Sequence, residues 1–260
     1  MRFSFDPAVI ALILLGTALY VRAVRVLAGR GYRVPRGQQA AWHGGMLLTA
    51  VGLLSPIDPL GEDLLSAHMA QHLLIADLVG LLVALGLTGP LLQPLLARRQ
   101  GLRRAFRFLR KPLVAIPVWI VILYGWHFAF LFDAALRSPL LHALQHESFV
   151  LGSLLVWWSV IEPKRRRLPG DLWKVPYILG ARLSGMFLGM AFIIMSSPAY
   201  ADFYGDRARE HGLSPLTDQQ IAGGMMLGLD LVVMLFCVGF FFYRSAEEHD
   251  RAHPTAAATG

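Results

Sequence analysis

The pattern of hydrophobic positions divides this chain into seven long apolar segments. Each is about 20 residues long, the length of an α-helix that crosses the hydrocarbon core of a bilayer. Because lipid offers no hydrogen-bond partner to an open backbone, such segments have to be helical. The pattern therefore predicts an all-α integral membrane protein, a bundle of seven transmembrane helices. We place these helices at residues 7–28, 38–55, 62–88, 113–133, 140–161, 175–198 and 218–243.

Composition supports this fold class. Hydrophobic residues make up 55% of the chain and charged residues 16%, whereas soluble domains carry about 25% charge. Arginines follow the first apolar segment instead of preceding it, so we interpret that segment as a retained helix and not as a signal peptide. We expect residues 1–245 to form one membrane domain and the polar residues 246–260 to form a disordered cytoplasmic tail.

The net charge of +7 is concentrated in alternate loops. Acidic residues such as Asp58, Glu62 and Asp63 occupy a loop of the other set. This is the positive-inside pattern, which places the N-terminus outside and the C-terminus in the cytoplasm. It favours contact of the basic loops with anionic membrane lipid, and not with nucleic acid. The basic residues after the third helix are Arg98, Arg99, Arg103, Arg104, Arg107, Arg110 and Lys111, and those after the fifth are Lys164, Arg165, Arg166 and Arg167.

Five of the nine histidines fall in the predicted outer half of the membrane, on three consecutive helices. His68 and His72 lie about 9 and 15 Å from the outer end of the third helix, and His127 about 9 Å from that of the fourth. His142 and His146 lie about 3 and 9 Å deep in the fifth helix. The i, i+4 spacing of each pair puts both imidazoles on one helix face. Because ionisable side chains inside a membrane are costly and usually functional, we predict a shared metal or haem site.

The neighbouring residues favour copper in its monovalent state. Neutral imidazole binds zinc, copper and iron, whereas a thioether selects the soft monovalent copper ion. Met69 flanks His68, and Met226 lies about 10 Å deep on the seventh helix. Glu147, next to His146, is a candidate hydrogen-bond acceptor behind that ring. The only cysteine, Cys237, can form no intrachain disulfide and is expected to be a core residue.

Several motifs resemble the multi-helix CtaG-type cytochrome c oxidase assembly factors, over roughly residues 60–235. They are His68-Met69-Ala70-Gln71-His72-Leu73-Leu74, the Gly89-Pro90 turn, Trp126-His127, His142-x-x-x-His146 leading to Trp157-Trp158, and Asp218-Gln219-Gln220-x-x-Gly223-Gly224-Met225-Met226.

The resemblance implies a non-enzymatic protein of the prokaryotic plasma membrane that helps to mature haem-copper oxidase by supplying copper. Its implied partners are the oxidase subunits and a copper donor, and the sequence leaves homo-oligomerisation open. On the matching positions, the implied copper ligands are His68, His72, His127, His142 and His146. The implied supporting residues are Met69, Gln71, Asp218, Gln219 and Met226.

Three other functions fit the same residues. A membrane haem protein could use one histidine from the third helix and one from the fifth as axial ligands. An intramembrane zinc hydrolase would need a carboxylate beside the metal, for which Glu147 is the candidate. A scaffold for oxidase subunits would bind no metal.

Three deep charges lie outside this histidine pattern. Asp77 on the third helix and Asp230 on the seventh lie about 22 and 18 Å from the outer ends of their helices. Arg182, about 12 Å from the inner end of the sixth helix, reaches a similar level. Because charges so deep are almost always paired, we expect Arg182 to meet Asp77, Asp230 or both. Asp77 is nine residues after His68, about 180° round an α-helix, so we expect it to face away from the metal site.

Overall fold

The computed structural model describes residues 3–87, 89–92, 100–161 and 172–252, and every regular element in these ranges is helical. The elements are α1 (Pro7–Gly29), α2 (Arg36–Leu54), α3 (Ile57–Asp63), α4 (Leu65–Leu73), η1 (Leu74–Val79), α5 (Gly80–Gly86), η2 (Gly89–Leu91), α7 (Gln100–Leu109), α8 (Pro112–His127), α9 (Ala129–Arg137), α10 (Pro139–Ile161), α11 (Lys174–Ile194), α12 (Ala201–Glu210) and α13 (Pro215–Ala252).

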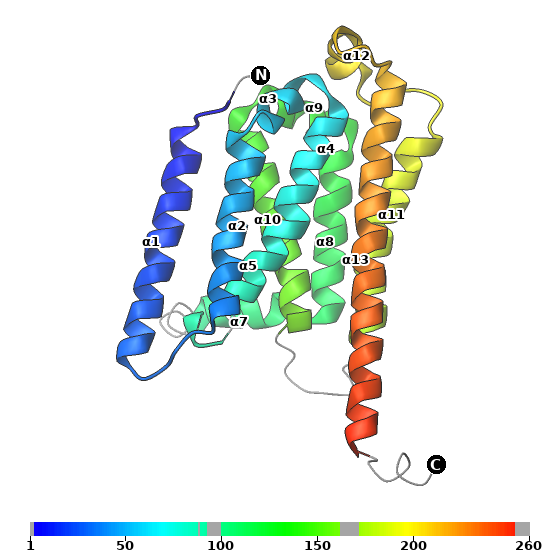
Figure 1. Cartoon of the computed structure of the whole chain (residues 1–260). Coiled ribbons are helices and arrows are strands. Elements are labelled where there is room, and N and C mark those ends of the chain that lie inside the picture. The colour runs from blue at the N-terminus through cyan, green and yellow to red at the C-terminus, as the bar shows by residue number, and fades with distance from the viewer. Residues whose placement is uncertain (1–2, 88, 93–99, 162–171, 253–260) are drawn as a thin grey trace.

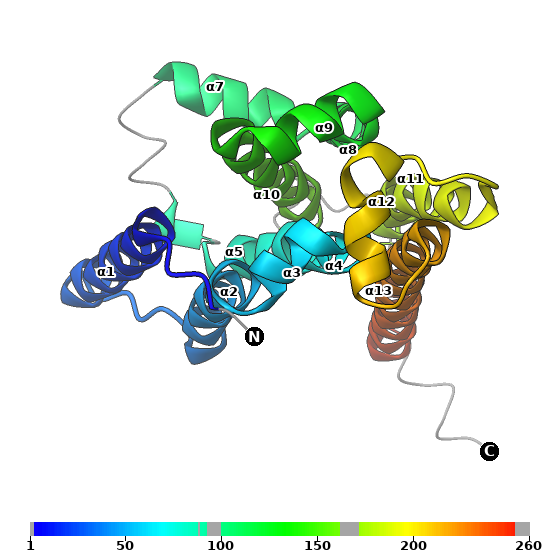
Figure 2. The same ribbon diagram turned by 90° about the horizontal axis from the view of Figure 1, so that it is seen from above.

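The long helices run side by side along one direction (Figure 1). The short helices α3, α9 and α12 gather at one end of the bundle, which we name the α12 end, together with the N-terminus. The basic helix α7 and the C-terminus lie toward the opposite end, the α7 end. Seen from above, α4, α5, α8 and α10 lie between the α1–α2 side and the α11–α13 side (Figure 2).

The described residues contain four candidate membrane spans, or six if two bent helix pairs each count as one span. The four are Pro7–Gly29, Leu65–Gly86, Lys174–Ile194 and Pro215–Arg251. The helix α10 is 23 residues long but is not among them. An all-helical membrane-type bundle is therefore supported within the described ranges, while the predicted seven spans and the orientation of the termini stay predictions.

The predicted helix 113–133 is broken, which corrects the sequence interpretation. The helix α8 ends at His127, and α9 leaves it at an angle of 72°. Phe128 between them has extended backbone angles of φ −66° and ψ 131°. The side-chain hydroxyl of Tyr200 donates a hydrogen bond of 2.7 Å to the carbonyl oxygen of His127, which satisfies a carbonyl group at the end of α8. The break places His127 at a helix end.

The predicted helix 62–88 is also irregular. Its first residues belong to α3, which is bent by 44° from α2, and the continuous span starts at Leu65. Its middle, Leu74–Val79, is a π-helical segment. A π turn takes more residues than an α turn, so it rotates the residues after it relative to those before it. Such segments are frequent at functional sites, and this one follows His72 directly.

The helices α11 and α13 pack closely through glycine. A Cβ atom on Gly189 would lie 2.7 Å from the carbonyl oxygen of Gly223, and one on Gly223 would lie 2.5 Å from the carbonyl oxygen of Gly189. Small residues of this kind allow the backbones of membrane helices to approach. The neighbouring Gly224 faces open space.

Two sequence predictions concern the α7 end. In α7, Arg103, Arg104 and Arg107 are exposed, while Phe106 packs edge-on against Trp158 with ring centroids 5.3 Å apart. This arrangement is typical of a helix that lies at a membrane surface. The basic residues Arg98, Arg99, Lys164, Arg165, Arg166 and Arg167 lie outside the described residues. The helix α13 continues to Ala252, beyond the predicted start of the tail at residue 246. Residues 253–260 lie outside the described part.

Candidate metal centre

The structure brings four of the five predicted histidines into one cluster, which we call the histidine cluster: His68 and His72 on α4, and His142 and His146 on α10. Ring centroids lie 4.2 Å apart within the α4 pair and 4.3 Å apart within the α10 pair. Between the helices, the His68 and His142 rings are 5.3 Å apart and the His72 and His146 rings 5.0 Å. His68 and His72 are buried, and the α10 pair is half-buried. The i, i+4 spacing of each pair directs its two rings toward the facing helix.

Three of these rings approach the geometry of a metal site. Ligand nitrogens of His68, His72 and His142 all lie within 4.8 Å of one another. Two nitrogens bound to one zinc-sized ion at about 2 Å each lie at most about 4 Å apart. Small rotations of these side chains would therefore complete a three-histidine site.

Each of the five predicted histidines has a buried ring nitrogen without a hydrogen-bond partner among the described residues. These nitrogens are His68 Nε2, His72 Nδ1 and Nε2, His127 Nε2, His142 Nε2 and His146 Nε2. A buried polar atom without a partner is costly and calls for an explanation such as an ion. Nitrogen atoms that are free to bind and close to one another are what a metal such as copper or zinc requires.

A backbone carbonyl group fixes which nitrogen is free on the ring of His127. Nδ1 of His127 lies 2.7 Å from the carbonyl oxygen of Leu123, which can only accept, so Nδ1 carries the proton and Nε2 keeps its lone pair. The backbone of Gly61 lies close to the ring of His68, whose Nε2 has no partner among the described residues. Carbonyl groups that orient an imidazole in this way are typical of metal-binding histidines.

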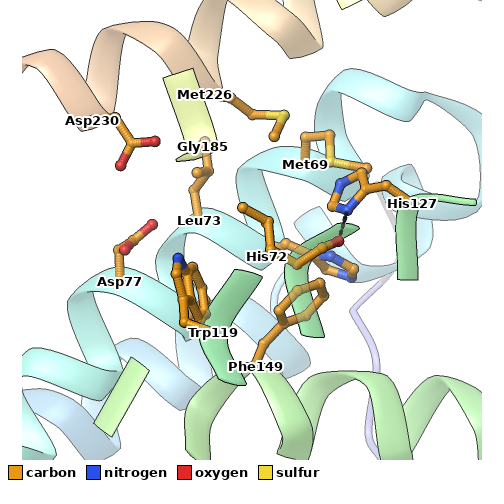
Figure 3. A pocket seen from close by; sticks show the side chains of 12 residues that line it. Met69, His72, Leu73, Asp77, Trp119, His127, Phe149, Gly185, Met226 and Asp230 are labelled. Atoms are coloured by element: carbon orange, nitrogen blue, oxygen red, sulfur yellow. Dashed lines mark hydrogen bonds between the residues drawn. The ribbon is translucent and has the colours of Figure 1, made fainter. Parts of the chain in front are cut away.

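His72 also lines a cavity of about 30 Å³ beside the cluster, which we call the central cavity. Met69, His127 and Met226 line it as well, from α4, α8 and α13. Figure 3 shows Met69, Met226 and His127 gathered on one side of this cavity. Both sulfur-bearing side chains are almost fully buried, at 1% and 4% exposed. The two methionines that the sequence singled out therefore lie next to the imidazoles.

Asp218 holds the start of α4 from α13, 153 residues away. Its carboxylate accepts hydrogen bonds from the backbone N–H groups of Leu65, at 2.7 Å, and Ser66, at 3.1 Å. The residue before α4, Leu64, provides no side-chain cap of its own. Asp218 thus replaces a local N-cap for the helix that carries His68 and His72.

Two tyrosines hold backbone groups at the α12 end: Tyr200 directly before α12 and Tyr204 within it. Tyr200 donates to the carbonyl oxygen of His127, and Tyr204 donates to that of Gly61 at 2.9 Å. Burial raises the pKa of both hydroxyl groups, so they remain protonated donors at neutral pH. Gln219 works in the same way, since its side chain bonds to the backbone of Ala199 and Phe192. These residues position the histidines without touching a ligand.

Gln71 connects the cluster to a residue that sequence analysis used only for its charge. Its amide nitrogen donates to the carbonyl oxygen of Gly52 at 2.9 Å and to the carboxylate of Asp58 at 2.8 Å. Asp58 also lies within electrostatic range of His142. Nothing in the sequence pattern distinguished Asp58 from the other acids of its loop.

The proposed role of Glu147 is not supported by its position. Its side chain is exposed, whereas the free nitrogen of His146 is buried. One helical step rotates a side chain by about 100°, which turns Glu147 away from the cluster.

The three deep charges meet, as their depths predict. Arg182 Nη1 donates to the carboxylates of Asp77 and Asp230, the latter at 2.8 Å. The guanidinium also lies over the ring of Trp157. The expectation that Asp77 faces away from the metal site is wrong, because Asp77 lines the same cavity as His72. The intervening π segment changes the helical rotation on which that expectation was based.

The remaining histidines that the structure describes lie elsewhere. His43 stands edge-on to Tyr20 with ring centroids 5.8 Å apart. His211 is exposed and lies 3.3 Å from a carboxylate oxygen of Asp63. His249 is in the last turn of α13.

Two buried polar residues were missed by the sequence analysis. Trp119 lines the central cavity, and its Nε1 atom has no partner in the part of the chain that the structure describes. Gln145 is fully buried between the two histidines of α10, and neither end of its amide group has a partner within the described ranges. Their type gave no signal, because tryptophan is frequent at membrane interfaces and glutamine can serve to hydrogen-bond across membrane helices.

The fold and the site fit one class, multi-pass helical membrane proteins with a buried histidine cluster near one end of the bundle. The model of the cytochrome c oxidase caa3 assembly factor family (Caa3_CtaG) matches residues 18–248. The chain belongs to this family, as its motifs predicted.

Mycobacterial proteins are similar to this chain. The uncharacterized protein Mb0105 of Mycobacterium bovis is 28% identical over 254 residues, which cover 86% of this chain and 37% of that protein. ML1998 of Mycobacterium leprae is 26% identical over 256 residues, with coverages of 91% and 38%. The chain thus spans little more than a third of the length of these relatives. No solved structure matches it.

Proposed function

We propose that this chain is a non-catalytic assembly factor that binds monovalent copper at the histidine cluster and passes it to cytochrome c oxidase. Two observations carry the proposal. The imidazoles have buried nitrogens without a partner among the described residues, and His68, His72 and His142 on two helices each offer a ring nitrogen within 4.8 Å of the others. Family membership supplies the process, oxidase assembly. Its partners would be oxidase subunits and a copper donor, and the bacterial relatives fit a location in the plasma membrane.

The ligand types support copper as the metal. Imidazole accepts several transition metals, while buried methionine sulfur favours the monovalent copper ion. Met69 and Met226 lie beside His127 and His72 around the central cavity. A metal-transfer protein needs a site that can exchange ligands, and a second group of weaker ligands next to the first supplies this.

The orientation proposed for the protein follows from its charges. Exposed arginines lie on α7, toward the end that also holds the C-terminus. By the positive-inside rule this end faces the cytoplasm. The histidine cluster lies toward the α12 end, so copper would enter from the outer face.

The haem alternative fits the geometry less well. A bis-histidine haem needs a macrocycle between its two axial rings. In this chain the facing α4 and α10 rings are 5.0–5.3 Å apart, and the central cavity measures about 30 Å³. An absorption spectrum without a Soret band would exclude this alternative.

The zinc hydrolase alternative loses the carboxylate that the sequence suggested for it. Its mechanism needs an acid beside the metal-bound water, and Glu147 is exposed. A metal-free scaffold remains the direct competitor of the copper proposal, and the next experiment separates the two.

Replacing His72 and His146 together by alanine should abolish copper co-purification, because the change removes one imidazole from each helix of the cluster. The measurement is the copper content of protein purified without a polyhistidine tag, together with oxidase activity in the same cells. The matched control is His43→Ala with His211→Ala, which removes two imidazoles outside the cluster. Unchanged copper stoichiometry in the cluster variant would refute the proposal, and intact oxidase maturation without copper would favour the scaffold.

A further inference from the structure

The side of the central cavity opposite Met69 and His127 is lined by two buried carboxylates. Asp77 comes from η1 and Asp230 from α13, and each is 5% exposed. Figure 3 shows both side chains on this side of the cavity, with Trp119 beside them. Gly185 on α11 makes space for Asp230, because a Cβ atom there would collide with Oδ2 of that residue.

A single guanidinium serves both acids. The same nitrogen of Arg182, Nη1, donates to Oδ1 of Asp77 and to Oδ1 of Asp230. With both acids ionised, the three groups carry a formal charge of −1. A net charge in a buried, low-dielectric site is costly, so a proton or another cation is needed to offset it.

Two hydrogen-bond donors without a partner among the described residues lie at this site and indicate that both carboxyl groups can become ionised. Arg182 Nη2 and Trp119 Nε1 are both buried and have no acceptor within the described ranges. The side chains that carry them are 2% and 4% exposed, and Trp119 lines the cavity. Donors held in this way can stabilise an additional carboxylate charge when it forms.

The other titratable groups near the cluster come from several helices. Tyr177 on α11 and Cys237 on α13 lie within electrostatic range of Arg182. His72 on α4 and His127 on α8 line the same cavity as the two acids. These groups are neutral side chains in their usual form, so none of them supplies the missing positive charge.

We propose that Asp77, Arg182 and Asp230 form a proton-binding site. Release of its proton is coupled to the binding of a cation at the adjoining histidine cluster. One of the two carboxyl groups holds a proton while the histidines hold no cation. When a monovalent copper ion binds, that O–H bond breaks and the proton leaves to solvent. One positive charge enters and one leaves, so the buried charge is unchanged and no oxidant or reductant is needed. The inference rests on the proposed function, because copper is the cation.

The test is a count of the protons released when monovalent copper is added to the full chain, purified without a polyhistidine tag and free of metal. The parent protein is compared with Asp230→Asn, in which Asp77 and Arg182 balance each other and no extra proton is held. We expect about one proton fewer per bound copper in the variant, from the charge count above. Equivalently, for each pH unit the affinity of the parent for copper should rise by a factor about ten times larger than the factor for the variant.

The matched control is Asp206→Asn, which changes an exposed acid at the α12 end. It should release as many protons as the parent. Equal proton counts in the parent and in Asp230→Asn, with copper bound by both, would overturn this inference and leave the copper proposal intact. A parent protein that binds no copper would overturn both.

A second measurement needs no variant, in case Asp230→Asn does not fold. The infrared difference spectrum of the parent on copper addition should show the loss of the carbonyl stretch of a protonated carboxyl group. A spectrum without that loss, under conditions where copper binds, would contradict the proposal.

Discussion

Polar side chains inside this bundle divide into those that are fully paired and those that are not. Asp218, Gln219 and Gln71 each bond to backbone groups of another helix or loop. The imidazoles of the histidine cluster instead keep free nitrogens. Because burial makes an unpaired polar group costly, a stable fold retains such groups only where something else stabilises them. The paired side chains therefore stabilise the contacts between helices, whereas the free imidazole nitrogens point to a bound ligand.

The cap that Asp218 provides can be tested by Asp218→Ala. The change leaves two buried N–H groups at the start of α4 without an acceptor, so we expect a loss of about 1–3 kcal/mol in the free energy of unfolding. The measurement is thermal or denaturant unfolding in detergent. Asp206→Ala, which removes an exposed surface pair, should change stability by no more than about 1 kcal/mol. If the two variants unfold alike, Asp218 does not hold α4.

The grouping of the histidines could be predicted from the sequence, whereas the roles of several neighbouring residues could not. The i, i+4 pairs and their depth follow directly from sequence spacing. Asp58, Tyr204 and Trp119 act through contacts with residues far away in the chain, such as the 143 residues between Tyr204 and Gly61. A spacing rule reports on one helix, so it is silent about such pairs.

Irregular elements shape the site more than the regular helices do. The break after His127 ends α8 at the depth of the cluster. The π segment after His72 rotates Asp77 toward the central cavity. Neither proline nor glycine stands at positions 74–79 or at Phe128. For this reason the hydropathy pattern predicted the helices 62–88 and 113–133 as regular spans and missed both features.

Close packing of α11 on α13 predicts a clear difference between two glycine substitutions. Gly189→Ala places a methyl group 2.7 Å from the carbonyl oxygen of Gly223, so the helices must separate. We expect a loss of about 1–3 kcal/mol in unfolding free energy, the usual cost of overpacking.

The control is Gly224→Ala, where the methyl group meets open space. It should be neutral or stabilise the helix by up to about 1 kcal/mol, because alanine is the better helix former. Equal unfolding midpoints for the two variants would contradict the packing. The sequence shows two adjacent glycines, and only the structure distinguishes them, since they face different sides of α13.

On the scale of the whole molecule, the candidate metal ligands lie toward one end and the exposed positive charges toward the other. The histidine cluster lies near α3, α9 and α12, and exposed arginines lie on α7. The central cavity links the cluster to the buried Asp77–Arg182–Asp230 group. Copper handling at the outer side, with proton release from the adjoining acids, is the account that joins these features.

The most direct test of this account is the X-ray absorption spectrum of copper bound to protein that was purified without a polyhistidine tag. We expect monovalent copper with two to four imidazole nitrogens at about 2 Å. Failure to retain copper, or a spectrum without imidazole ligands, would contradict the central claim that the histidine cluster binds the metal.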